Sequence, residues 1–408
     1  MRIDEAKALD AADPLAFARA RFRLPDGVIY LDGNSLGALP AATASALVEV
    51  AERQWGDDLI TSWNKHQWIE APSRVAAILA PIVGARPSEL LIADSTSVTL
   101  FKLLAAAAQA QSGRSVILSE DGNFPTDLYV AQGLAGLLPH LSLRTVKAAD
   151  VAAAIDGDTA VVMLTHVDYR TGAVYDMATV NAVARSAGAI TLWDLSHSAG
   201  ALALDLDGTG CDLAVGCGYK YLNGGPGAPA FLFVAEALQD TLRSPLTGWM
   251  GHADPFAFET GHRPAAGIAR FLTGTPSILA IAALEAGLGT FDDIAMADVE
   301  AKSRALSQWF IDEVERRCGD HLHLASPRDS ALRGSHVVFA HDDAYAVMQA
   351  LIGRGVIGDF RTPDLIRFGF APLYNGFTEA LRAADILADI LARGEWDQPR
   401  FAQRARVT

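Results

Sequence analysis

The chain has 408 residues, half of them apolar and one fifth charged, with a formal net charge of −15 and a pI near 5.0. This is ordinary globular composition, and a chain of this length is expected to form about two domains. The acidic balance and the scattered Lys and Arg residues argue against nucleic acid or an anionic membrane as a partner.

The first 55 residues are predicted to form a short helix, a turn and a second helix that begins near Pro40. The charged N-terminus lacks the apolar core of a signal peptide, and no stretch of about 18 apolar residues predicts a transmembrane helix. Cys211, Cys217 and Cys318 form no CxxC pair and no disulfide framework, which fits a reducing compartment. We therefore expect a cytoplasmic protein.

Between residues 56 and 290, predicted helices alternate with short β-rich runs. The helices are expected at 73–83, 97–110 and 178–187, and the strands at 115–119, 160–167, 189–195, 213–217 and 230–234. Short apolar strands between helices indicate a mostly parallel sheet that is covered on both faces. Ligands of such α/β sheets bind at the carboxyl ends of the strands.

The pattern changes after residue 290. A long helix at 296–317 is followed by SHVVFAH, a helix at 343–353, the runs VIGDF and LIRFGF, and a final helix from residue 377. This order predicts a smaller α+β domain. We therefore expect an N-terminal segment (1–55) that packs with the small domain, a large domain (56–290) and the small C-terminal domain (291–408).

Asp194 and His197 follow the strand that is predicted in ITLWDL. An isolated pair of this kind is compatible with a helix N-cap and a neighbouring loop histidine. A buried carboxylate also needs a cationic partner, and the protonated nitrogen of a pyridine ring would serve. Both interpretations stay open at this point.

Lys220 stands after the apolar run LAVGC, between Tyr219 and Tyr221 and before the turn GGPG. It is either an incidental loop lysine or an amine that carries chemistry. Pyridoxal phosphate requires a lysine for a Schiff base and an acid that keeps its ring nitrogen protonated. Desolvation between two tyrosines would make the amine a better nucleophile.

The run DSTS precedes a predicted helix and offers Thr96 and Ser97 as phosphate ligands, because a helix N-terminus favours an anion. The same residues could simply cap the helix. The two roles are compatible. The phosphate-binding role is favoured when DSTS is considered together with Asp194 and Lys220, which follow it along the chain.

With these motifs in order, the sequence resembles the kynureninase family of pyridoxal-phosphate (PLP) enzymes. The resemblance runs from about residue 30 to residue 376 and rests on YLDGNSLGALP, DSTSVTLFK, NFPTDLY, LTHVDYRTGAVYDM, LWDLSHSAGAL, CGYKYLNGGPG, GWMGH and RFGFAPLYN. It implies α/β architecture of the PLP-dependent transferase fold type I, with a mostly parallel central sheet in the large domain and a smaller C-terminal α+β domain.

The resemblance also implies roles for individual residues. Lys220 would bind the cofactor and move protons, Asp194 would pair with the pyridine nitrogen, and Tyr219 would act as an acid and a phosphate ligand. Further cofactor contacts would come from Thr96, Ser97, Phe124, Asp127, Thr165, His197, Trp249 and Thr275, of which Thr275 could belong to a second subunit.

On the substrate side, the resemblance implies that Arg367 clamps the α-carboxylate, for which its planar fork is suited. Taken alone, Arg367 would be a surface ion-pair residue, and Phe124 and Trp249 would be core aromatics. Ser35 in GNSLG is a second candidate for substrate contact. Trp63 and His66 in SWNKHQW either receive the aromatic ring of the substrate or pack against a partner chain.

We therefore predict a homodimeric PLP-dependent hydrolase, with its active site at the subunit interface, that acts in tryptophan and NAD metabolism. It would cleave L-kynurenine, or its 3-hydroxy form, to L-alanine and anthranilate or 3-hydroxyanthranilate. A cysteine desulfurase or another β-lyase of the same fold is the main alternative, but it needs a cysteine on a mobile loop, and Cys318 lies at a predicted helix end. A cofactor-free binding protein conflicts with the intact Lys220, Asp194 and Arg367. The scattered histidines predict no metal site.

Overall fold

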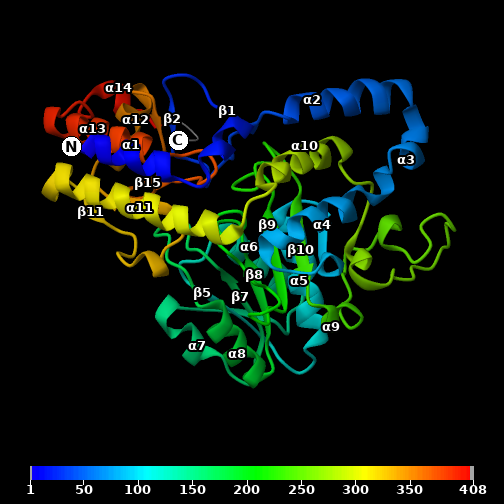
Figure 1. The fold of residues 1–408 in the computed structure, drawn as a ribbon. Coiled ribbons are helices and arrows are strands. Elements are labelled where there is room, and N and C mark those ends of the chain that lie inside the picture. The colour runs from blue at the N-terminus through cyan, green and yellow to red at the C-terminus, as the bar shows by residue number, and fades with distance from the viewer. Residues whose placement is uncertain (1, 405–408) are drawn as a thin grey trace.

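The computed structural model describes residues 2–404, and its centre is a mixed seven-stranded sheet (Figure 1). The strand order is β4-β10-β9-β8-β7-β5-β6, in which β6, β5, β7, β8 and β9 run parallel and β10 is antiparallel to both of its neighbours. The strands are β4 (Leu90–Ala93), β5 (Val116–Glu120), β6 (Ser142–Val146), β7 (Thr159–Thr165), β8 (Ile190–Asp194), β9 (Leu213–Cys217) and β10 (Ala230–Val234). The predicted α/β architecture is confirmed, and all five predicted strands of the large domain are present.

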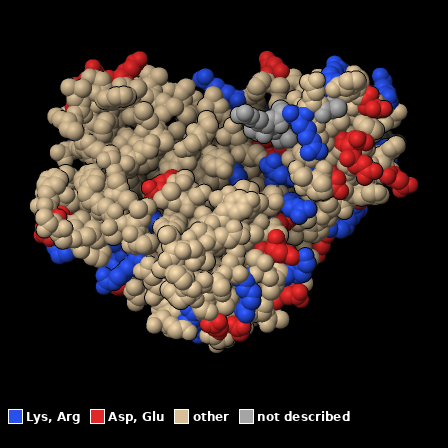
Figure 2. Space-filling view, turned by 180° about the vertical axis from the view of Figure 1, so that it is seen from behind, with Lys and Arg blue, Asp and Glu red and all other residues tan. Residues whose placement is uncertain are grey.

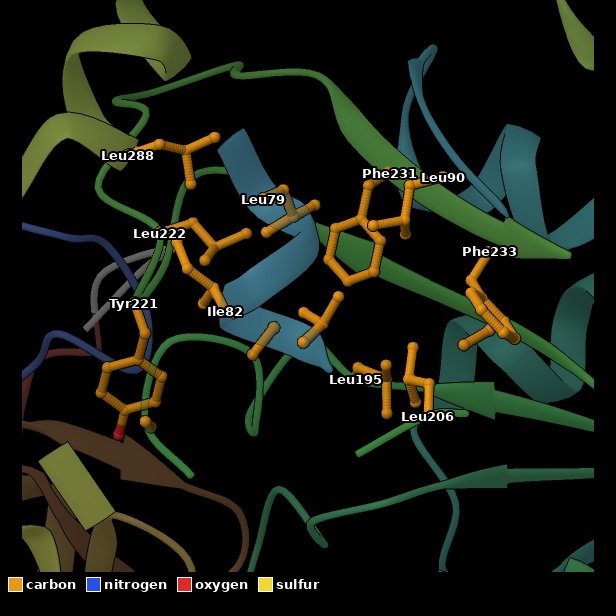
Figure 3. Close-up of a cluster of buried hydrophobic side chains, with 14 of the residues drawn as sticks. Leu79, Ile82, Leu90, Leu195, Leu206, Tyr221, Leu222, Phe231, Phe233 and Leu288 are labelled. Atoms are coloured by element: carbon orange, nitrogen blue, oxygen red, sulfur yellow. The ribbon is translucent and has the colours of Figure 1, made fainter. Parts of the chain in front are cut away.

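Helices cover both faces of this sheet, which is why its strands read as continuous apolar runs. Side chains of one face pack against helices α4, α8 and α10, and those of the other face pack against α5 and α6. Figure 3 shows part of the first layer, where Leu79 of α4 lies near Phe231 of β10. The helices are α4 (Ala71–Val83), α5 (Thr96–Ala110), α6 (Pro125–Leu137), α7 (Val151–Ala154), α8 (Met177–Ala187), α9 (Glu236–Gln239) and α10 (Ile278–Leu288).

A four-stranded antiparallel sheet, ordered β11-β12-β15-β14, forms the centre of the C-terminal part. Its separate core is built with the long helices of that region, which Figure 1 shows beside the N-terminal helix α1 (Arg2–Ala12). The elements are α11 (Met296–Cys318), β11 (His323–Leu324), β12 (His336–Ala340), α12 (Ala344–Gly353), β13 (Val356–Ile357), β14 (Asp359–Arg361), β15 (Leu365–Gly369), α13 (Phe377–Arg393) and α14 (Pro399–Ala402).

The N-terminal segment contacts both parts of the molecule. Helix α1 packs against α13, and β2 (Ile29–Tyr30) pairs in parallel with β13, so the first thirty or so residues lie against the C-terminal part. Before β2, β1 (Phe22–Arg23) pairs with β3 (Leu39–Pro40), which follows β2, and the next helix α2 (Thr43–Val48) packs against α10. The exact domain boundaries at 55/56 and 290/291 stay a prediction.

Beyond α2, the chain continues through wider helical turns over Glu49–Asp57 to α3 (Ser62–Lys65). Figure 1 shows that this stretch runs away from the C-terminal part and turns back toward α4 at α3. We call residues 49–70 the arm. Within residues 2–404, no helix combines the length and the apolar character that crossing a bilayer requires.

Candidate active site

The carboxyl ends of β7, β8 and β9 bring the predicted catalytic residues together. Asp194 ends β8 opposite Thr165 of β7, and Lys220 follows the end of β9 by three residues. The Nζ atom of Lys220 lies 3.1 Å from Nε2 of His197. The backbone N–H of Ser196 donates to Oδ1 of Asp194 at 2.7 Å, which fixes this carboxylate at the strand end.

The backbone of Lys220 is held from two sides. Tyr221 and Leu222 insert into the core layer drawn in Figure 3, so the chain is anchored directly after the lysine. From the other side, the backbone N–H of Gly37 in GNSLG donates to the carbonyl oxygen of Tyr219 at 2.8 Å. Asn223 then adopts a left-handed conformation with φ of 59°, which starts the turn GGPG. The Lys220 side chain is left half-buried at the sheet edge.

Burial dominates the electrostatics of this edge. It raises the pKa of Asp194, although the nearby Lys220 charge opposes this shift. It also raises the pKa of Asp127 well above its usual value, and the charge of Asp194 adds to the effect. Burial and the Lys220 charge lower the pKa of His197 well below its usual value, so this imidazole is neutral. Because burial disfavours the ionised form of Asp194, a protonated pyridine nitrogen beside it would stabilise the carboxylate.

Three further predicted residues converge on the same edge. Phe124 is the N-cap of α6, and its ring centroid lies 6.0 Å from Nζ of Lys220 and 5.2 Å from the ring of Tyr169. The Thr165 hydroxyl donates to Oδ1 of Asn123 at 2.5 Å and to Oδ2 of Asp127 at 3.3 Å. Phe124 is partly exposed, so its ring is available to a flat ligand next to the lysine.

A cavity of about 720 Å³ is lined by Tyr219, the residue before Lys220, and its wall also includes Ser35, Thr96 and Thr275. Thr96 is the first residue of α5, a helix of 15 residues, and the free N–H groups of this helix end suit a phosphate. Ser97 is half-buried at the second position of the same helix. The donor set fits the phosphate of PLP.

A buried lysine that the sequence analysis did not single out stabilises this candidate phosphate site. Lys102 of α5 is fully buried, and its Nζ pairs with the carboxylate of Asp94 and donates to the carbonyl oxygen of Phe271 at 2.8 Å. Asp94 has a φ of 51°, an uncommon value for a residue other than glycine. Lys102 thus ties the turn before α5 to the segment that leads to Thr275.

Arg367 of β15 is fully buried and comes from the C-terminal part to contact Tyr169 of the large domain. Its Nε donates to Oδ1 of Asp359 at 2.7 Å, one terminal nitrogen donates to the Tyr169 carbonyl at 2.7 Å, and the other donates to the Ser35 hydroxyl at 3.0 Å. Asp359 is directly opposite Arg367 in the sheet. Asp359 could not be predicted from the sequence, because the register of β14 against β15 is set by the fold.

Three predicted site residues lie elsewhere in this chain. Trp249 is partly exposed, contacts Phe256 at 5.8 Å between ring centroids and lines a separate cavity of about 320 Å³. Trp63 and His66 lie on the arm, where Trp63 packs edge-on against Trp68 and Nε2 of His66 lies 2.7 Å from the Asp58 carboxylate. Their roles in a site stay predictions.

Comparison with known proteins links this arrangement to a family. Residues 299–387 match the family model described as kynureninase C-terminal domain. Proteins named kynureninase from Pseudomonas fluorescens and from Burkholderia mallei (strain SAVP1) are each 50% identical over 412 aligned residues, which cover 99% of this chain and 99% of theirs.

Solved structures show the same fold at lower identity. An apo cysteine desulfurase from Thermococcus onnurineus NA1 has a TM-score of 0.80 and 20% identity, covering 93% of this chain and 98% of that chain. A C-DES mutant with glycine covalently linked to the PLP cofactor has a TM-score of 0.78 and 20% identity, covering 91% and 99%. The predicted type I fold of PLP-dependent enzymes is thereby confirmed.

Proposed function

Because this chain belongs to the kynureninase family, we propose that it hydrolyses the Cβ–Cγ bond of L-kynurenine to give anthranilate and L-alanine, with pyridoxal 5′-phosphate as cofactor. One observation in the structure supports this most strongly. A half-buried lysine, a buried strand-end carboxylate and a neutral histidine meet at one sheet edge, and Tyr219, next to the lysine in the chain, lines a cavity with a helix N-terminus in its wall.

The cofactor, when bound, supplies an electron sink for the pair released as Cα loses its proton. Lys220 would hold it and accept the Cα proton through Nζ. Asp194, buried and fixed by the Ser196 N–H, would keep the ring nitrogen protonated. Because the pKa of His197 is lowered, this imidazole is neutral and adds no positive charge beside Lys220.

We propose Tyr219 as the acid that protonates Cβ after the Cβ–Cγ bond breaks. It lines the same cavity as Thr96 and Ser35, one residue before the lysine. Burial raises the pKa of its hydroxyl, so the proton is retained at neutral pH and is available for transfer to Cβ. Arg367 and Ser35 would orient the substrate through its α-carboxylate.

The desulfurase alternative is not favoured, although the solved structures with the same fold include such enzymes. Cys318 is the only cysteine after residue 290, and it is buried at the end of α11 with 3% of its surface exposed. Burial raises the pKa of its thiol to about 11, so little thiolate forms at neutral pH.

We also propose a cytoplasmic homodimer. Large apolar side chains are exposed on the arm, where Ile60 is 76% exposed, and on the loop that carries Phe258, which is 79% exposed. Figure 2 shows a wide area of one face on which charged side chains are sparse. Such surfaces mark protein–protein contacts. In a homodimer, Trp63, His66 and Trp249 of one subunit would contribute to the active site of the other.

The test uses purified protein reconstituted with PLP. We expect a visible absorbance band from lysine-bound cofactor, and its loss in Lys220→Ala but not in Lys7→Ala, an exposed lysine of α1. The protein is then incubated with L-kynurenine, 3-hydroxykynurenine and cysteine. Anthranilate fluorescence from the first substrate supports the proposal; release of sulfide from cysteine without anthranilate would replace it with the desulfurase function.

A further inference from the structure

The cavity of about 720 Å³ has one charged side chain among the described residues of its wall, and that side chain is an anion, Asp94. Asp94 lies two residues before Thr96, and 29% of its side chain is exposed. A phosphate at the N-terminus of α5 would therefore lie close to a carboxylate, which repels it. The candidate phosphate site needs a positive charge that the wall itself does not supply.

Lys102 supplies this charge from behind the wall. It lies about two turns into α5, its side chain is fully buried, and it is not among the residues that line the cavity. Its Nζ pairs with Oδ2 of Asp94 and donates to the carbonyl oxygen of Phe271 at 2.8 Å. A buried ammonium is costly unless it is paired, so Asp94 and Lys102 act as one unit with no net charge.

The backbone at Asp94 does not by itself require a carboxylate. Asp94 follows β4 with a φ of 51°, and its carbonyl oxygen accepts the Ala230 N–H of β10 at 3.0 Å. Asparagine adopts this left-handed conformation as readily as aspartate does. The role of the carboxylate is therefore best sought in its charge and in its contact with Lys102.

The second acceptor of Lys102 keeps the ammonium away from the cavity. Phe271 begins the segment that leads to Thr275, and a Cβ atom at Gly248 would lie only 2.2 Å from the Thr273 carbonyl oxygen of this segment. The segment is thus closely packed against the loop that carries Trp249. Lys102 is held in place by fixed backbone and reaches the candidate phosphate site only through Asp94.

We propose that Lys102 is a positioning residue for the cofactor phosphate, which neutralises and orients Asp94 so that the N-terminus of α5 accepts a dianion. This rests on the proposed function, in which PLP binds with its phosphate at Thr96 and Ser97. Lys102 acts through Asp94 and does not contact the phosphate. The ligand group it serves is a phosphate monoester, whereas the aldehyde and the ring are bound by the residues around Lys220.

The experiment titrates the full-length protein with PLP and with pyridoxal, which has the same aldehyde and ring but no phosphate. The visible band of bound cofactor gives both dissociation constants, and the ratio of pyridoxal to PLP measures the contribution of the phosphate. In Lys102→Met this ratio should fall about tenfold or more, because Asp94 is left as an unpaired anion, while the constant for pyridoxal stays unchanged. The matched control is Lys302→Met, since Lys302 of α11 is also buried and pairs with Asp13 at 2.6 Å; its ratio should equal that of the wild type.

Two further variants separate charge from shape. Asp94→Asn keeps the backbone preference and an acceptor for Lys102 but leaves one net positive charge, so its ratio should rise above that of the wild type. Asp94→Asn combined with Lys102→Met is neutral again and should return the ratio to within about threefold of the wild type.

A purely structural ion pair would instead give a fall in all three variants. An unchanged ratio in Lys102→Met, or a fall in Asp94→Asn, overturns the inference. The second outcome needs only an isosteric substitution, so it can be read even where Lys102→Met does not fold. Absence of kynurenine cleavage by the wild type would refute the proposed function, and the fluorescence assay measures this separately from the binding ratios.

Discussion

Replacing Gly37 by alanine should damage catalysis through the backbone of Lys220. A Cβ atom at Gly37 would lie 2.4 Å from the carbonyl oxygen of Lys220, 2.5 Å from Oδ1 of Asn223 and 2.9 Å from Cα of Asn223. Ordinary contact begins at 3.4 Å, so the GNSLG loop and the Lys220 segment must separate by 3.4 − 2.4 Å, or about 1 Å. Two of the three contacts are backbone atoms, so a side-chain rotation cannot relieve them.

A displacement of about 1 Å at a catalytic group can lower a rate about 100-fold, and overpacking costs about 1–3 kcal/mol of stability. We therefore expect Gly37→Ala to fold and bind PLP, with kcat for kynurenine reduced by about two orders of magnitude. Anthranilate fluorescence gives kcat, and the visible band of bound cofactor confirms the holoenzyme. The matched control is Gly133→Ala in α6, where a Cβ meets nothing within 4 Å. Equal kcat values for the two variants would refute the reasoning.

Two further predictions concern the assembly and pH. If the proposed homodimer forms through the arm, Ile60→Asp should give monomer in sedimentation velocity and reduced activity, because it places a charge on an exposed apolar side chain of the arm. Leu332→Asp, also exposed but outside the arm, should then leave the proposed dimer intact. Burial lowers the pKa of His336 from 6.5 to about 3. On acidification the unfolded chain therefore takes up a proton on this side chain at a higher pH than the folded chain does. The free energy of unfolding should then fall between these two pH values. Denaturant midpoints of His336→Gln should fall less over this range; equal acid sensitivity would contradict this assignment.

The fold was predictable where burial leaves a clear pattern. Strands β7 to β10 are buried throughout and mostly apolar because helices cover both faces, and the sequence marks each of them. Strand β6 was missed because it is an edge strand whose residues, SLRTV, are exposed or half-buried. Strand β4 was missed because it has only four residues. The antiparallel direction of β10 could not be predicted, because an apolar run carries no direction.

The site residues that lie at the ends of strands could be predicted from the sequence. Lys220, Asp194 and Thr96 follow or precede apolar runs, so the rule for parallel sheets places them together. Asp359 could not be predicted by this rule. It meets Arg367 through the register of β14 against β15, and a strand register leaves no local signal in the sequence.

The GNSLG loop links the segments that carry Lys220 and Arg367, the two residues proposed to act on one substrate. Leu31, just before it, donates to the Ile357 carbonyl and accepts from the Gly369 N–H, each at 2.7 Å, so the loop is anchored to the C-terminal part. The same loop contacts Arg367 through Ser35 and the Lys220 segment through Gly37. Any shift of the small domain therefore moves contacts to both groups at once. The spacing between the proposed carboxylate clamp and the proposed cofactor lysine is thus set by one short stretch of chain, which must be short and glycine-rich to fit between them.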